Sequence, residues 1–292
     1  MIDLIIPTLS QGLLWSLLAL GVYITFRVLD FADMTVEGSF PLGAAICVYF
    51  LIRDHHPLLA LLAAGLLGGV AGIVTGLLHT KLRIPSLLAG ILSMIALYSV
   101  NLRIMGKANV SLLGKETAFT YMETLGLDYA QSVFIVGLLA TVVIGTLIYW
   151  FFGTEIGAAI RATGFNPQMI RAQGIDTNVM LLLGLFLSNA LTAMAGAFIG
   201  MNNGFFDVGM GVGTIVIGRA SVIIGEVLFG TRSFKNSLVS VILGSIVYRF
   251  VIAIVLQMGM PPNDLKLFTS VLVVIALALP MMRDKVQRRK VG

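Results

Sequence analysis

Long apolar stretches, each about long enough to cross a bilayer as a helix, dominate this 292-residue chain. They occur at 5–26, 36–52, 58–78, 85–102, 130–152, 179–201, 213–230, 237–257 and 267–282. Only 11% of the residues are charged, against about 25% in soluble domains. The sequence therefore predicts an all-α polytopic membrane protein that contacts lipid along most of its length, with about 8–10 transmembrane helices.

Two of these stretches, 36–52 and 213–230, predict broken helices. The first carries a glutamate and Pro41 near its start, and the second is preceded and opened by closely spaced glycines. Broken helices are tolerated in a membrane only where protein or a water-filled cavity satisfies the freed backbone groups. We expect both segments to lie inside the protein.

The two segments that contain these predicted breaks are similar to each other in sequence. Segments 31–46 and 205–220 share a Phe-x-Asp start, with Asp33 in one and Asp207 in the other. The two segments enter from opposite sides in the predicted topology, as the halves of inverted transporter repeats do. Chance similarity between two membrane segments is the alternative interpretation.

A polar segment at 154–178 interrupts the apolar pattern. Thr154 is placed to cap a short helix that we expect Gly164 to end, and Asn166-Pro167 to begin a second helix that Gly174 ends. Glu155 and Arg161 suit the dipole of the first helix. A rigid surface segment of this kind is typical of a docking site for another protein, and a capped loop without a partner is the alternative.

The distribution of Lys and Arg predicts the orientation, since cytoplasmic loops are enriched in both. With the C-terminus cytoplasmic, one side collects Arg27, Lys81, Arg83, Arg161, Arg171, Arg232, Lys235, Arg283, Lys285, Arg288, Arg289 and Lys290. The other side collects Arg53, Arg103, Lys107, Lys115 and Lys266. Segment 154–178 and a basic tail at 283–292 are then cytoplasmic.

Charged residues within or beside the apolar stretches are candidates for a translocation path: Asp33, Glu37, Arg219, Glu226 and Arg249. The two arginines are expected at comparable depth in the outer halves of their spans. They could attract a substrate carboxylate, or snorkel and bond to backbone carbonyls between packed helices. Asp33 could cap the broken second helix or act in gating.

Several classes of chemistry have no sequence support. There is no G-x-x-x-x-G-K-[ST] motif, no nucleophilic serine elbow and no His/Cys cluster with metal-ligand spacing, so we expect neither a catalytic nor a metal site. The single Cys47 lies in an apolar stretch. The positive net charge is best explained by lipid headgroups, and nucleic acid is not an expected partner. The first apolar stretch is expected to be a retained span and not a signal peptide.

Two places in the chain resemble bacterial ABC-importer permeases of the branched-chain amino acid and ribose type. The first is Gln11-Gly12, Ala19-Leu20-Gly21, Phe31-Ala32 and Gly38-Ser39, which is similar to their first-helix signature. The second is Gly157, Arg161-Ala162, Gly164, Asn166-Pro167 and Gly174-Ile175, which is similar to their cytoplasmic coupling segment. Together with the spacing of the apolar stretches, the resemblance covers most of the chain. Within the group it is most similar to permeases paired with lipoprotein receptors, some of them for tryptophan or tyrosine.

The resemblance implies a single permease domain over 1–292 in the bacterial inner membrane. It implies a permease homodimer, a cytoplasmic ATP-binding subunit that holds ATP and Mg, and an extracellular solute-binding lipoprotein. The implied coupling residues are Glu155, Arg161, Gly164, Asn166, Arg171 and Gly174. The expected function is ATP-driven import of a small solute such as an amino acid, with no cofactor in this chain. A stand-alone ion-coupled transporter or a channel is the alternative.

Overall fold

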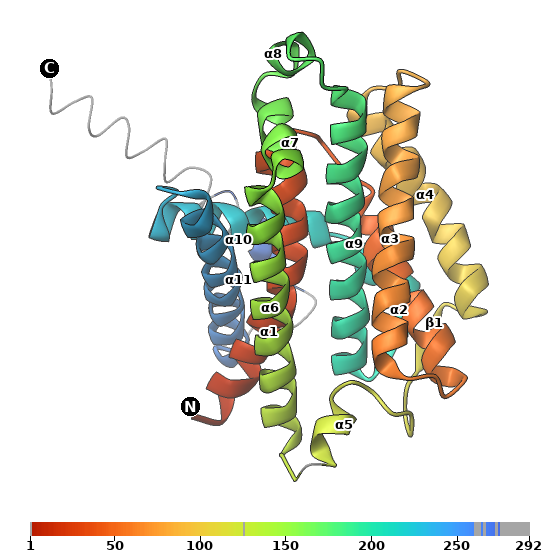
Figure 1. Ribbon diagram of the computed structural model, residues 1–292. Helices are drawn as coiled ribbons and strands as arrows, with labels where there is room; N and C mark the ends of the chain where they lie inside the picture. The colour runs from red at the N-terminus through yellow and green to blue at the C-terminus, as the bar shows by residue number, and fades with distance from the viewer. Residues whose placement is uncertain (1, 125, 260–263, 265–266, 272–273, 275–292) are drawn as a thin grey trace, which may run out of the picture.

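The structure is a computed structural model that describes residues 2–124, 126–259, 264, 267–271 and 274. Its main helices are α1 Ile2–Tyr23, α2 Val36–Ile52, α3 Pro57–Thr80, α4 Ser86–Met105, α6 Tyr129–Gly153, α9 Thr177–Asn203, α10 Thr214–Phe229 and α11 Phe234–Gln257 (Figure 1). Shorter helices are the π-helical η1 Ile24–Val28, then α5 Thr120–Glu123, α7 Glu155–Phe165, α8 Pro167–Ala172 and the 3-10 helix η2 Val208–Gly211. Strands β1 Asn109–Ser111 and β2 Phe205–Asp207 pair antiparallel.

The predicted all-α membrane fold is confirmed. In the described residues, seven helical segments are long and apolar enough to cross a membrane, with η1 counted as the end of the first and η2 as the start of the sixth. The shorter α2 is the eighth apolar helix. Without η1 and η2, the eight α-helices match the first eight predicted stretches to within about three residues at each end. The ninth, 267–282, lies largely outside the described residues, and the tail 283–292 lies wholly outside them.

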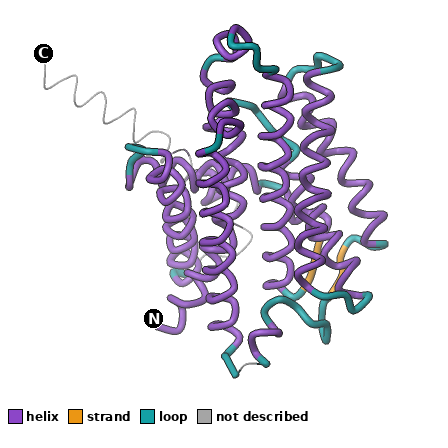
Figure 2. Tube along the Cα trace, in the orientation of Figure 1, coloured by secondary structure: helices purple, strands orange, loops and turns teal. Residues whose placement is uncertain are grey.

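The bundle has two distinct ends. Figure 1 shows α7, α8 and the turn between α3 and α4 at one end, which we call the α8 end. Figure 2 shows the two short strands toward the opposite end, where α5 also lies; we call this the strand end. Among the described residues, Lys81 and Arg83 of one predicted basic set lie in the α3–α4 turn at the α8 end, and Lys115 of the other set lies near the strands.

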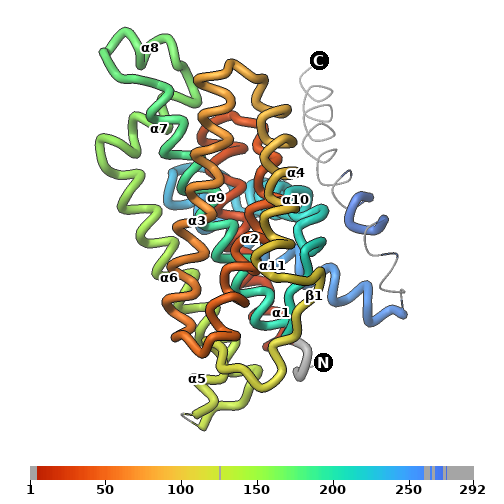
Figure 3. Tube along the Cα trace, turned by 90° about the vertical axis from the view of Figure 1, so that its right-hand side faces the viewer, coloured from red at the N-terminus to blue at the C-terminus, as the bar shows by residue number. Residues whose placement is uncertain are grey.

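Helix α9 holds the centre of the bundle together by packing against α1, α2 and α3 (Figure 3). Small residues on α3 make the closest approach possible, because a Cβ at Gly72 would lie 2.2 Å from the carbonyl oxygen of Leu185. The glycine-rich face of α3 is therefore buried within this chain. On the opposite face of α3, large leucines such as Leu62, 62% exposed, form an apolar surface suited to lipid.

The predicted breaks do not lie within the two apolar stretches: α2 runs without interruption through Pro41, α10 is also continuous, and the chain turns before each of them. Asp33 Oδ1 accepts a hydrogen bond from the backbone N–H of Thr35 at 2.9 Å, and Asp207 Oδ1 accepts one from the N–H of Gly209 at 2.7 Å. The same turn thus precedes both short helices. Their N-terminal ends also meet, since Glu37 Oε1 accepts a hydrogen bond from the N–H of Gly213 at 3.1 Å. The inverted repeat itself stays a prediction.

Candidate functional site

The caps predicted for the polar segment are present. Thr154 Oγ1 accepts a hydrogen bond from the N–H of Gly157 at 3.3 Å, and Asn166 Oδ1 accepts one from the N–H of Met169 at 3.1 Å. Gly174 takes a left-handed conformation with φ +84° just after α8. These bonds satisfy N–H groups that a helix start otherwise leaves free, so α7 and α8 form a well-defined element above α6 and α9.

The prediction that Gly164 ends the first helix is wrong by one residue, because α7 ends at Phe165 and Asn166 is its C-cap. Pro167 explains the end point: the residue before a proline is pushed into an extended conformation, here φ −151° and ψ 89°. Gly164 serves a close approach instead. A Cβ at this position would lie 1.9 Å from the carbonyl oxygen of Val28 in η1. Helix α7 therefore rests directly on the end of the first span.

The charged side chains of this segment divide between its inner and outer faces. The Arg161 guanidinium lies over the ring of Phe234, with Cζ 5.0 Å from the ring centroid, and Arg171 Nε donates to Thr177 Oγ1 at 2.7 Å. Both arginines thus hold the segment to α11 and α9. Glu155 is exposed in the first turn of α7.

The same segment also exposes three large apolar side chains. Ile156, Phe165 and Met169 are 49%, 94% and 45% exposed. We call these three the exposed apolar residues of α7–α8. The sequence analysis missed them because it singled out capping and charged residues. The signal was present, since large apolar side chains within a polar segment outside the spans have no lipid to contact.

Glu226 forms an ion pair that the sequence analysis did not anticipate. Arg27 Nε lies 2.9 and 3.1 Å from the two carboxylate oxygens of Glu226, and Arg27 Nη2 also donates to Oε2. This pair ties η1 to α10. The contacts of Gly164 with η1 and of Arg27 with Glu226 connect α7 to α10 through a single turn of π-helix.

The prediction that Arg219 and Arg249 lie at comparable depth is wrong. The Arg219 guanidinium lies over Phe26 in η1, with Cζ 5.0 Å from the ring centroid, on the side of the α8 end. The Arg249 guanidinium lies over Trp15, in a pocket that also contains the last residues of α9 at the strand end. A hydropathy pattern shows which residues belong to a membrane span. It does not give the tilt of the helix or the direction of a long side chain, and both determine how deep the charged group lies.

Asp33 occupies a buried polar network between α2 and α9. Its Oδ2 accepts a hydrogen bond from Asn189 Nδ2 at 2.8 Å, and Asn189 Oδ1 accepts one from Ser39 Oγ at 2.7 Å. The prediction that Asp33 caps the second helix is wrong: Thr35 is the N-cap residue of α2, no side chain caps this helix start, and Asp33 bonds to the N–H of Thr35 in the turn before the helix. Asn189 was missed, although an amide in the middle of an apolar stretch is itself a functional signal.

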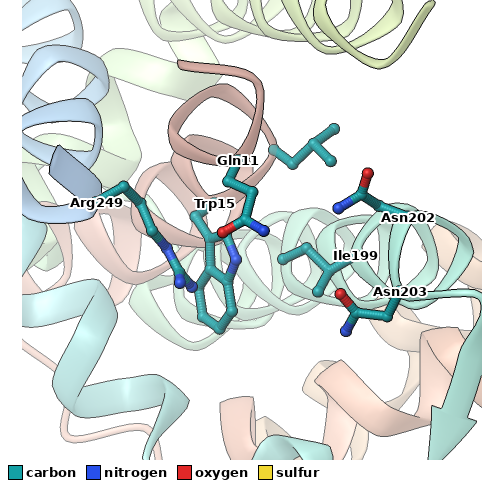
Figure 4. Close-up of a pocket in the computed structure, with 7 residues that line it drawn as sticks. Gln11, Trp15, Ile199, Asn202, Asn203 and Arg249 are labelled. Carbon is teal, nitrogen blue, oxygen red and sulfur yellow. The ribbon is translucent and has the colours of Figure 1, made fainter. Parts of the chain in front are cut away.

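One pocket joins α1, α9 and α11. Its volume is about 170 Å³, and its polar lining consists of Gln11, Trp15, Asn202, Asn203 and Arg249 (Figure 4). Of these, the sequence analysis singled out only Arg249 as a path candidate. The spacing of Gln11 and Trp15, four residues apart, places both on one face of α1. Their meeting with the end of α9 depends on tertiary packing that a single sequence does not display.

Comparisons with known proteins agree with this architecture. The family model described as the permease component of branched-chain amino acid transport systems matches residues 4–278. A tyrosine transport system permease protein of Clostridioides difficile is 40% identical over 274 residues, covering 94% of this chain and 90% of that protein. The fructose import permease protein of Rhizobium meliloti is 25% identical, covering 87% of this chain and 71% of that protein. The autoinducer 2 import system permease protein of Salmonella typhimurium is 26% identical, covering 75% and 61%. No solved structure matches the chain.

Proposed function

Because this chain belongs to the permease family of branched-chain amino acid transport systems, we propose that it carries an amino acid through the membrane as one half of a homodimer. Membership makes it the transmembrane subunit of an ATP-driven importer, with ATP hydrolysed on separate subunits. The 40% identity with a tyrosine transport permease supports an amino acid over a sugar as the substrate. An external solute-binding lipoprotein delivers that substrate.

Segment 154–178 is the part that receives force from the ATPase. The observation that supports this is the contact of Gly164 with Val28, which leaves no gap between α7 and the first span. Glu155 and the exposed apolar residues of α7–α8 supply a surface for contact with the ATPase. Arg161, Asn166, Arg171 and Gly174 keep the segment rigid, so that a push is transmitted and not absorbed.

Docking of the ATPase on segment 154–178 also sets the orientation of the chain in the membrane. The α8 end and the tail 283–292 face the cytoplasm, and the strand end faces the receptor, within the bacterial inner membrane. Asp33, Glu37, Arg219, Glu226 and Arg249 border the moving parts of the translocation path. An ion-coupled carrier is less well supported, because the acidic residues of the described spans are engaged: Glu37 with Gly213 and Glu226 with Arg27.

The substitution Gly164→Ala tests the proposed coupling. Its methyl group collides with the Val28 carbonyl, so α7 must move away from η1. Overpacking of this kind costs about 1–3 kcal/mol, and we expect ATP-dependent uptake to fall about tenfold while the ATPase stays bound. The measurement is uptake of radiolabelled L-tyrosine by proteoliposomes that contain the permease, the ATPase and the receptor.

Gly153→Ala is the matched control, because a Cβ at Gly153 meets nothing within 4 Å. It should support uptake at the unmodified rate. If Gly164→Ala transports as well as Gly153→Ala, the contact does not transmit force and the coupling proposal is wrong. Uptake by the permease alone down an ion gradient would instead support the stand-alone carrier.

A further inference from the structure

The pocket between α1, α9 and α11 contains an arginine without an anionic partner. Arg249 Cζ lies 3.9 Å from the centroid of the Trp15 ring. Its Nε and Nη2 are buried and have no hydrogen-bond acceptor among the described residues. The ion pairs found among the described residues are Arg27–Glu226 and Lys115–Asp54. Arg249 takes part in neither pair.

This arrangement is costly unless something else offsets the cost. A charged side chain within a span costs about 2.5–3.5 kcal/mol on insertion scales, and a buried unpaired donor about 1–3 kcal/mol. The contact with Trp15 recovers about 0.5–2 kcal/mol. A guanidinium fixed by stacking and short of acceptors is suited to bind a carboxylate, for which its planar fork is preorganised.

The other polar side chains of the pocket are amides. Gln11, Asn202 and Asn203 line it, and in the described part of the chain their side chains take part in no hydrogen bond within the protein. The carbonyl of Asn202 accepts a hydrogen bond from Tyr129 Oη at 3.1 Å, which fixes this end of α9 against α6. Amide oxygens accept from an ammonium group and amide nitrogens donate to a carboxylate. Three free amides beside an arginine therefore complement both charges of a zwitterion.

We propose that this pocket binds the head group of an amino acid, with the α-carboxylate on Arg249 and the α-ammonium group on the amide oxygens of Gln11, Asn202 and Asn203. The proposal rests on the proposed function and assigns it a substrate site. The volume of about 170 Å³ holds a head group and leaves a large side chain outside, consistent with a site that accepts amino acids of different size. Among the residues that the structure describes, no acidic side chain lines the pocket to compete for the guanidinium.

Trp15 provides a direct reporter of binding. The chain has two tryptophans, and Trp150 is 69% exposed on α6, so Trp150→Phe leaves Trp15 as the only indole. The purified full-length permease in lipid nanodiscs is titrated with L-tyrosine and L-leucine, and separately with their carboxamides, which lack the carboxylate. Excitation at the red edge of the indole band avoids the absorption of tyrosine. We expect saturable changes in emission and at least about tenfold weaker binding of the carboxamides, as a lost charge-assisted hydrogen bond implies.

The preference for the acid should depend on the guanidinium. In the Trp150→Phe background, Arg249→Gln should bind acid and carboxamide equally weakly. Arg53→Gln is the matched control, because Arg53 also stacks on an aromatic ring, 3.5 Å from the centroid of Tyr49, but does not line the pocket. It should keep the preference. Equal binding of acid and carboxamide by the unmodified pocket, or a preference that survives Arg249→Gln, would overturn the proposal.

A second variant keeps the test decisive if Arg249→Gln does not fold. Asn203 is exposed at the end of α9, and Asn203→Asp places a competing carboxylate in the pocket. It should weaken binding of the acid at least about tenfold, whereas Asn203→Ala should weaken it less. Failure of both Asn203 variants to alter binding refutes the site. Uptake separates the two proposals: ATP-driven uptake that is indifferent to Arg249→Gln contradicts only the pocket, and no uptake by the unmodified importer contradicts the proposed function.

Discussion

At the scale of single residues, Asp33 and Asn189 show how a polar pair can specify a membrane bundle. Asp33 is 1% exposed and Asn189 is fully buried, yet each carboxylate oxygen of Asp33 accepts a hydrogen bond. Because no water reaches these groups, their hydrogen bonds must come from the protein, and only one packing of α2 on α9 supplies them. The pair therefore fixes where α2 begins.

The substitution Asp33→Asn should destabilise the protein by about 1–3 kcal/mol, because one of its two hydrogen bonds would then join two donors. The double substitution Asp33→Asn with Asn189→Asp should recover part of this loss, because the Leu185 carbonyl, which accepts a hydrogen bond from Asn189 Nδ2 at 3.1 Å, loses its side-chain donor. In that variant the carboxylate at position 189 accepts hydrogen bonds both from the amide at position 33 and from the Ser39 hydroxyl. Thermal unfolding of the purified permease, followed as Tm, measures both effects. A double variant no more stable than Asp33→Asn would show that the partners do not act as a pair.

At the scale of elements, the π-helical turn η1 connects the polar segment to the spans. Helix α7 contacts it through Gly164, and Arg27 joins it to Glu226 of α10. The ion pair is half exposed on the Arg27 side, so its contribution to stability is small, about 0–1 kcal/mol. The ion pair acts mainly as a mechanical link, because the bidentate contact of Arg27 with Glu226 holds α10 at a fixed position relative to η1.

This gives a prediction in which transport and stability separate. Glu226→Gln should lower Tm only slightly but reduce ATP-driven uptake several-fold, since α10 would no longer move with η1. The reciprocal exchange of Arg27→Glu with Glu226→Arg should restore uptake in the same proteoliposome assay. If Glu226→Gln transports normally, or if the exchange fails although both proteins fold, the ion pair is not part of the connection.

The same elements show what could be predicted from sequence. Helix positions were predictable because apolar length and caps such as Thr154 and Asn166 are local signals. The role of Gly164 was not, because a close approach to Val28 requires a partner distant in sequence. The opposite directions of Arg219 and Arg249 and the amide-lined pocket are further products of helix tilt and packing. Local sequence signals were therefore sufficient to predict the helices. The candidate site could not be predicted, because it depends on how the helices pack together.

At the scale of the whole molecule, the proposed mechanism requires a single orientation. The polar segment must face the cytoplasm, where ATP is available, and the strand end must face the receptor. The described basic residues favour this: Arg27, Lys81, Arg83, Arg161, Arg171, Arg232 and Lys235 belong to the set at the α8 end, and Arg53, Arg103, Lys107 and Lys115 to the set at the strand end. The difference between the sets is modest, so the orientation calls for a direct measurement.

Cysteine labelling can measure the orientation directly, because the single native Cys47 is fully buried and should not react. Leu113, 91% exposed, lies beyond β1, and Gln173 is exposed at the end of α8. A membrane-impermeant maleimide added to intact spheroplasts should label Leu113→Cys and leave Gln173→Cys unmodified until the membrane is permeabilised. The reverse pattern would place the polar segment outside the cell, where no ATPase could dock on it, and the proposed route of force from α7 through η1 would have no source.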